Sequence, residues 1–175
     1  MKVVITQPTY LPWLGYFELV AQADVFVFLD TVQFERQSWE SRNKIRSADG
    51  RVQWLPVPVI SAPLDTLIKD TQLAPNAHGV FRKQYQTIRQ ALRKAPFFSE
   101  VVDLLRPHFD ASTIPEKLAD LNVRFVQGCS RSRELSWPAK SGCILSIHSK
   151  GKSLNHTSPV SMPSHQLAWS GVPSF

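Results

Sequence analysis

A short segment near the start of the chain concentrates side chains that can hold a polar ligand. Residues 7–16 supply one amide, two phenol hydroxyls and one indole N–H. Pro8 and Pro12 each fix a backbone angle, and Gly15 lets backbone or ligand approach closely. We predict that the segment lines a ligand site, although any one of its rings would suit a packed turn equally well. The candidates are Gln7, Tyr10, Trp13 and Tyr16.

A second segment, Asp30–Arg46, combines an acid with rings and cations. Asp30 can act as a base or grip a sugar hydroxyl or a metal, and it would equally suit a helix cap or an ion pair. Arg and Lys bind phosphate or carboxylate, although a charge run is more often a solvated face. We predict catalytic roles for Asp30, Gln7 and Tyr10. Predicted substrate-binding residues are Trp13, Tyr16, Gln33, Trp39, Arg42, Asn43 and Lys44.

Two strands and a helix are predicted to bring these segments together. Residues 2–6 and 24–30 are apolar, β-branched or aromatic runs typical of buried strands, and 14–23 has the spacing of a helix that packs on a sheet. Such a βαβ unit is parallel, and ligands bind beyond the carboxyl ends of parallel strands. The sequence therefore predicts an α/β, Rossmann-like three-layer domain with a mainly parallel sheet that opens with a βαβ unit, followed by a helical segment.

The remaining elements are predicted by periodicity. Residues 51–59 alternate but contain two prolines, which favours a sheet edge or an extended arm. Residues 80–94 place apolar side chains at helical spacing, and 100–106 and 115–122 predict two shorter helices. Residues 123–126 resemble the start of a strand.

Composition changes after Val126. Residues 127–175 hold 12 serines against six in residues 1–126, and 13 of the 14 acids precede the change. We predict an α/β domain over 1–126 and a poorly ordered or out-of-frame tail over 127–175. A frameshift and a natural disordered tail both explain the pattern, so we expect no catalytic residue in the tail.

Several function classes are disfavoured by the sequence. The net charge is +6, but much of the surplus lies in the tail, so we expect no nucleic-acid partner. No apolar run is long enough to span a bilayer or to form a secretory signal, so we expect a cytoplasmic protein. P-loop, G-x-G-x-x-G and G-x-S-x-G motifs are absent. Neither the histidines nor the two cysteines have metal-ligand spacing, and we expect no cofactor.

The N-terminal strings resemble the WbqC-like protein family. The similarity lies in residues 1–17, 24–30, 32–34 and 42–45, with Trp39 and the segment Lys94–Phe98. Members belong to O-antigen and related polysaccharide gene clusters. The resemblance implies a glycine or aminoacyl-type transferase that acts on a sugar or nucleotide-sugar precursor in surface polysaccharide biosynthesis. It covers about residues 1–126.

Other interpretations stay open at the level of sequence. The turn at residues 12–16 lies where nucleotidyltransferase-like enzymes carry H-x-G-H, but both histidines are absent here. A non-catalytic module that binds a sugar nucleotide or scaffolds a complex also fits, since no nucleophile is evident. So does an inactive, truncated product. The residues leave open whether the chain is an enzyme and in which oligomeric state it exists.

Overall fold

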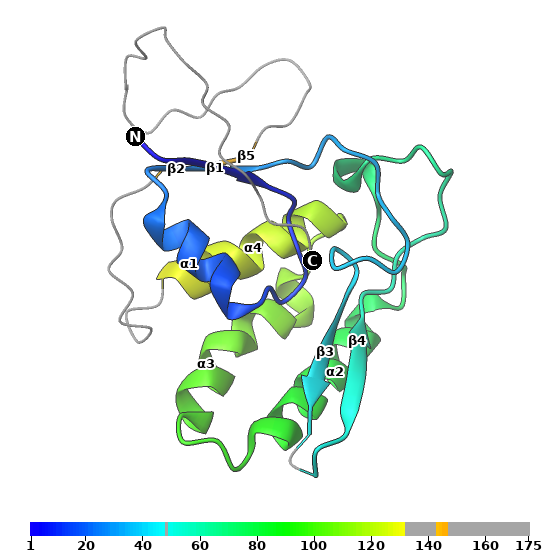
Figure 1. Cartoon of the computed structure of the whole chain (residues 1–175). Coiled ribbons are helices and arrows are strands. Elements are labelled where there is room, and N and C mark those ends of the chain that lie inside the picture. The colour runs from blue at the N-terminus through cyan, green and yellow to red at the C-terminus, as the bar shows by residue number, and fades with distance from the viewer. Residues whose placement is uncertain (48, 132–142, 147–175) are drawn as a thin grey trace, which may run out of the picture.

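The computed structural model describes residues 1–47, 49–131 and 143–146 (Figure 1). It contains a three-stranded sheet, a two-stranded hairpin, four α-helices and two short 3-10 helices among these residues. The strands are β1 Val3–Thr6, β2 Val25–Phe28, β3 Arg42–Arg46, β4 Val52–Pro56 and β5 Cys143–Ser146. The helices are α1 Leu14–Gln22, η1 Ile68–Asp70, α2 Ala77–Leu92, α3 Phe98–Phe109, η2 Ala111–Thr113 and α4 Leu118–Arg131.

The opening βαβ unit is confirmed. β1 and β2 pair in parallel, with Val3 opposite Val25 and Thr6 opposite Phe28, and β5 pairs in parallel on the other side of β2. β2 is the central strand because its aromatic and β-branched residues can be buried on both faces. The carboxyl ends of β1 and β2 therefore lie at the same edge of the sheet, and the two candidate segments begin there.

Helices α1 and α4 cover one face of this sheet (Figure 1). Tyr16 of α1, Phe26 and Phe28 of β2 and Val126 of α4 are buried together in one core cluster. Val3 and Ile5 point away from it and are 48% and 57% exposed. The mixed α/β class is thus confirmed, whereas the three-layer arrangement stays a prediction.

A larger core cluster lies between the hairpin and helices α2, α3 and α4. Phe81 and Ile88 of α2 meet Phe109 of α3 and Phe125 of α4, and Leu55 closes the cluster from β4. Their spacing along α2 is that of an amphipathic helix. Because α4 gives Phe125 to this cluster and Val126 to the sheet cluster, one helix joins the two cores.

Two predicted elements differ from the structure. Residues 123–126 are not a strand, because α4 continues through them to Arg131 and buries Phe125 and Val126. Residues 42–46, for which the sequence predicted no strand, form β3, which pairs antiparallel with β4. The predicted tail lies largely outside the described residues, and the division at Val126 stays a prediction.

Candidate functional site

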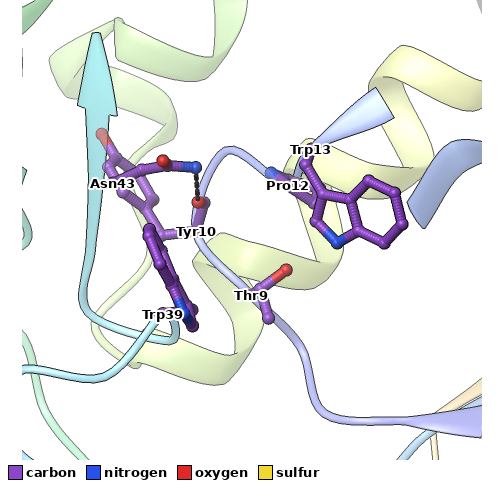
Figure 2. Close-up of a pocket in the computed structure, with 6 residues that line it drawn as sticks. All are labelled: Thr9, Tyr10, Pro12, Trp13, Trp39 and Asn43. Atoms are coloured by element: carbon purple, nitrogen blue, oxygen red, sulfur yellow. Dashed lines mark hydrogen bonds between the residues drawn. The ribbon is translucent and has the colours of Figure 1, made fainter. Parts of the chain in front are cut away.

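Backbone and side-chain hydrogen bonds hold the two candidate segments against each other. The amide of Tyr10 donates to the carbonyl of Trp39 over 2.9 Å. The side-chain amide of Asn43 donates in return to the carbonyl of Tyr10 over 3.1 Å (Figure 2). Asn43 also donates to the carbonyl of Leu11. The segments thus meet because polar backbone groups of one satisfy those of the other.

Asn122 of α4 holds the same junction through its side chain. Its side chain is fully buried, and its amide nitrogen donates to the carbonyls of Pro8 and Glu40, each over 2.9 Å. One side chain therefore joins both segments to the helix. Sequence reasoning missed Asn122, since a lone asparagine in a helical pattern gives no signal of a tertiary role.

Two residues at the junction adopt a left-handed backbone. Leu11 has φ 46° and Gln37 has φ 63°, values that residues with a Cβ rarely adopt. Leu11 lies within the first segment, and its carbonyl is held by Asn43. Such conformations persist where surrounding contacts determine the backbone, which occurs often at ligand sites.

A cavity of about 380 Å³ opens where the segments meet. The indoles of Trp13 and Trp39 lie on either side of it, with Thr9 between them (Figure 2). These indoles are 69% and 56% exposed, which is unusual for side chains of that size. The lining residues are Thr9, Tyr10, Pro12, Trp13, Trp39 and Asn43.

Gly15 allows Trp13 to take its position. A Cβ atom on Gly15 would lie 1.7 Å from Cζ3 of the Trp13 indole. The indole therefore lies directly over the start of α1, and any side chain at position 15 would displace it. The close approach predicted for Gly15 is made by a ring of the chain itself.

A second cavity, of about 650 Å³, adjoins the hairpin. Trp54 lines it and lies 6.2 Å from Trp39, measured between ring centroids, so the tryptophan pair links the two linings. Arg42 and Lys44 lie over the Trp54 ring at 4.2 and 4.5 Å from its centroid. Cation–π contact holds both charges beside an exposed indole.

Other predicted substrate-binding residues also surround this second cavity. Gln33 and Arg42 line it, and Gln33 donates to the carbonyl of Leu64. Arg42 reaches Gln37 over 3.4 Å. The predicted set is therefore divided, with Trp13, Trp39 and Asn43 at the first cavity and Gln33 and Arg42 at the second.

The predicted tyrosines serve the packing of the site. The Tyr10 hydroxyl is buried and donates to Oε1 of Gln84 over 2.6 Å, while Gln84 donates to the carbonyl of Pro56. The Tyr16 hydroxyl donates to the carbonyl of Gln7 over 3.0 Å. Burial raises the pKa of both phenols above the ordinary value. The Tyr10 hydroxyl is thus held in the core by Gln84, and its catalytic role stays a prediction.

The Asp30 carboxyl is also withdrawn from both cavities. Asp30 follows β2, is 0% exposed, and its backbone carbonyl accepts from the amide of Lys69 over 3.0 Å. A general base must lie within hydrogen-bond reach of its substrate. This placement favours a structural role for Asp30, and its predicted catalytic role has no support from either cavity lining.

Glu40 is a buried acid that sequence reasoning did not single out. It follows Trp39, is 6% exposed, and burial raises the pKa of its carboxyl. The folded protein thus holds this proton more tightly than the unfolded chain does. The contribution of protonated Glu40 to the free energy of unfolding is fully present below the pKa of the unfolded chain, about 4.3. It is lost as pH rises through the pKa of the folded protein.

We therefore expect Glu40→Gln to stabilise the protein at pH 7. In the parent, ionisation of Glu40 lowers the free energy of unfolding as pH rises above about 4.3. The variant should lack this contribution to the pH dependence. Urea unfolding at a series of pH values measures this. The exposed Glu116→Gln is the control, and an unchanged pH profile in Glu40→Gln would contradict the assignment.

The described residues contain neither a candidate metal site nor a candidate membrane-spanning helix. Within residues 1–47, 49–131 and 143–146, no three His, Cys, Asp or Glu side chains gather as a metal site would require. No helix in this part of the chain has the length and apolarity needed to cross a membrane.

Comparison with known proteins identifies the family. The sequence profile of the WbqC-like protein family matches residues 7–155, beyond the residue where the resemblance was expected to end. A Mycobacterium tuberculosis protein, named only as uncharacterized protein Rv1507c, is 32% identical over 143 residues, covering 78% of this chain. The chain spans 60% of the length of that relative. No solved structure matches this chain. The chain therefore belongs to the WbqC-like protein family.

Proposed function

We propose that the Trp13–Trp39 cavity binds the sugar ring of a nucleotide-sugar or glycan precursor. The protein would then act in surface polysaccharide (O-antigen) biosynthesis, as a glycine or aminoacyl-type transferase in the cytoplasm. Family membership supports the pathway. A Rossmann-like fold belongs to the same proposal, because such folds bind nucleotides beyond the carboxyl ends of their strands.

The exposed tryptophans carry this proposal. Trp13, Trp39 and Trp54 are 69%, 56% and 44% exposed and gather around two linked cavities. Burying an indole face against a sugar's C–H groups removes apolar surface from water. Asn43 completes the same lining by holding the backbone of Tyr10 and Leu11 in place, so the walls of the cavity are fixed before a ligand binds.

The second cavity suits the nucleotide half of such a ligand. Arg42 can bind a phosphate through its guanidinium, and the Trp54 ring holds Arg42 and Lys44 beside this cavity. Arg36 extends the cationic lining and donates to Ser61 over 2.9 Å. The linked cavities therefore match a ligand with a sugar at one end and a charged nucleotide at the other.

A non-catalytic binding module is the second candidate, and one observation favours it. The first cavity is lined by a threonine, a tyrosine, a proline, two tryptophans and an asparagine, without acid, histidine, lysine or thiol. Transfer chemistry usually needs a base or an activated nucleophile. If an enzyme, the protein must bring that group from outside this lining.

We expect Trp39→Ala to weaken binding of UDP-N-acetylglucosamine at least about fivefold while leaving unfolding unchanged. Loss of one stacked ring removes about 1–3 kcal/mol, and the side chain is more than half exposed. Gly15→Ala should act similarly by displacing Trp13. Quenching of tryptophan fluorescence during titration reports the affinity, with UDP and N-acetylglucosamine titrated separately.

Leu19→Ala is the matched control, since Leu19 is exposed on α1 and lines neither cavity. Equal affinity in Trp39→Ala and the control would refute the sugar site. Mass spectrometry of the nucleotide-sugar after incubation with a panel of activated glycine donors separates the two candidates. A glycyl mass increment supports the transferase, and binding without any increment supports the module.

A further inference from the structure

One face of α2 carries a concentration of positive charge. Residues 71–99 contain no acid. At about 100° per residue, the five basic side chains of α2 and its end fall within roughly 140° of the helix circumference. This arc is opposite Phe81 and Ile88, which pack into the core. The five exposed residues are Arg82, Lys83, Arg89, Arg93 and Lys94, here called the basic face.

No ion pair neutralises the basic face within the described part of the chain. Arg89 donates to the neutral side chain of Gln86 over 3.3 Å. Residues 1–126 hold 15 basic and 13 acidic residues, so α2 and the two residues after it carry a third of the basic residues of a nearly balanced segment. Its charge is therefore available to an anionic partner.

An exposed aromatic ring lies at the end of the basic face. Phe97 follows Lys94 by three residues and is 69% exposed. Pro96 precedes it and Phe98 begins α3. Cations attract a protein to anionic headgroups, and an exposed aromatic ring beside them can enter the interface.

We propose that the basic face and Phe97 dock the protein on an anionic lipid surface. The face is a convex helix surface, and it lines neither cavity described above. Single-stranded nucleic acids are usually bound in grooves with several stacking rings. A single ring at the edge of five cations instead matches a flat layer of anionic headgroups, where each cation adds to the attraction.

Co-sedimentation with vesicles tests this inference on the full chain. We expect binding to vesicles with 30% phosphatidylglycerol in phosphatidylcholine, little binding to pure phosphatidylcholine, and release in high salt. Arg89→Gln with Arg93→Gln should weaken partitioning by roughly fivefold per charge, or about thirtyfold in all. Lys2→Gln with Lys117→Gln, which removes two charges elsewhere, should change it far less.

Phe97→Ser separates a lipid surface from other polyanions. On a bilayer the variant should lose several-fold in partitioning, because the ring no longer enters the interface. Circular dichroism confirms that each variant remains folded. Absence of binding to the anionic vesicles overturns the proposal. It is also overturned if the Arg89/Arg93 and Lys2/Lys117 double variants lose partitioning equally, or if Phe97→Ser partitions like the parent. Tighter binding to an oligonucleotide than to the anionic vesicles would overturn it as well.

Discussion

Replacing Asn122 by Ala should lower the free energy of unfolding by about 2–4 kcal/mol. The side chain is fully buried, and its amide satisfies the carbonyls of Pro8 and Glu40. Removing it leaves two buried acceptors without a donor, each at a cost of about 1–3 kcal/mol. Urea denaturation measures the loss. The variant should also weaken binding of the proposed nucleotide-sugar ligand, because both segments of the site lose their common anchor.

Asn76→Ala provides a control of the same chemistry. Asn76 is exposed at the start of α2, and its side chain makes no capping hydrogen bond. Its replacement should change stability by less than about 0.5 kcal/mol. If Asn122→Ala is as mild as this control, the asparagine does not hold the two segments together.

Replacing Gln84 by Ala should have an effect of similar size, about 2–4 kcal/mol. Gln84 accepts from the Tyr10 hydroxyl and donates to the carbonyl of Pro56, and it is 5% exposed. The change strands both groups and leaves a void in the larger core cluster. Gln86→Ala, an exposed glutamine on the same helix, should cost less than about 0.5 kcal/mol.

A double-mutant cycle shows whether the pair acts as described. Tyr10→Phe alone should cost about 1–2 kcal/mol by orphaning the Gln84 oxygen. Because the two share one hydrogen bond of 2.6 Å, the double variant should lose less than the sum of the single losses. Additive losses would show that the Tyr10 hydroxyl is not coupled to Gln84.

The parts of the fold that follow from local pattern were predictable. The continuous apolar run of β2 and the helical spacing in α1 and α2 specify elements that bury one face or two. The parallel pairing of β1 with β2 then follows from the handedness of βαβ units. Convergence of residues 7–16 with residues 30–44 was predicted on that basis, and the hydrogen bonds between Tyr10, Trp39 and Asn43 now describe it.

Other features depend on tertiary contacts that a local pattern does not contain. β3 has the sequence Arg-Asn-Lys-Ile-Arg, which favours no strand by propensity. It becomes one because Trp54 of β4 lies opposite Lys44 and receives two cations on its ring. The burial of Tyr10 was equally hidden, since an aromatic ring suits a core or a ligand site.

Asn122 and Gln84 were missed for a related physical reason. Each is a single polar residue on an amphipathic helix, at a position where its side chain turns inward to meet backbone carbonyls. Helical periodicity can identify the inward face, but it assigns that face to apolar packing. Only the structure shows that bare carbonyls lie opposite these two amides.

Helix α4 packs into both core clusters, which constrains the number of residues in this helix. Phe125 and Val126 are adjacent, yet they belong to different cores. Inserting one residue between them would rotate the two halves of the helix by about 100° relative to each other. Only one half could then keep its packing. Homologous chains should therefore tolerate substitutions along this helix far more readily than a change in its residue count.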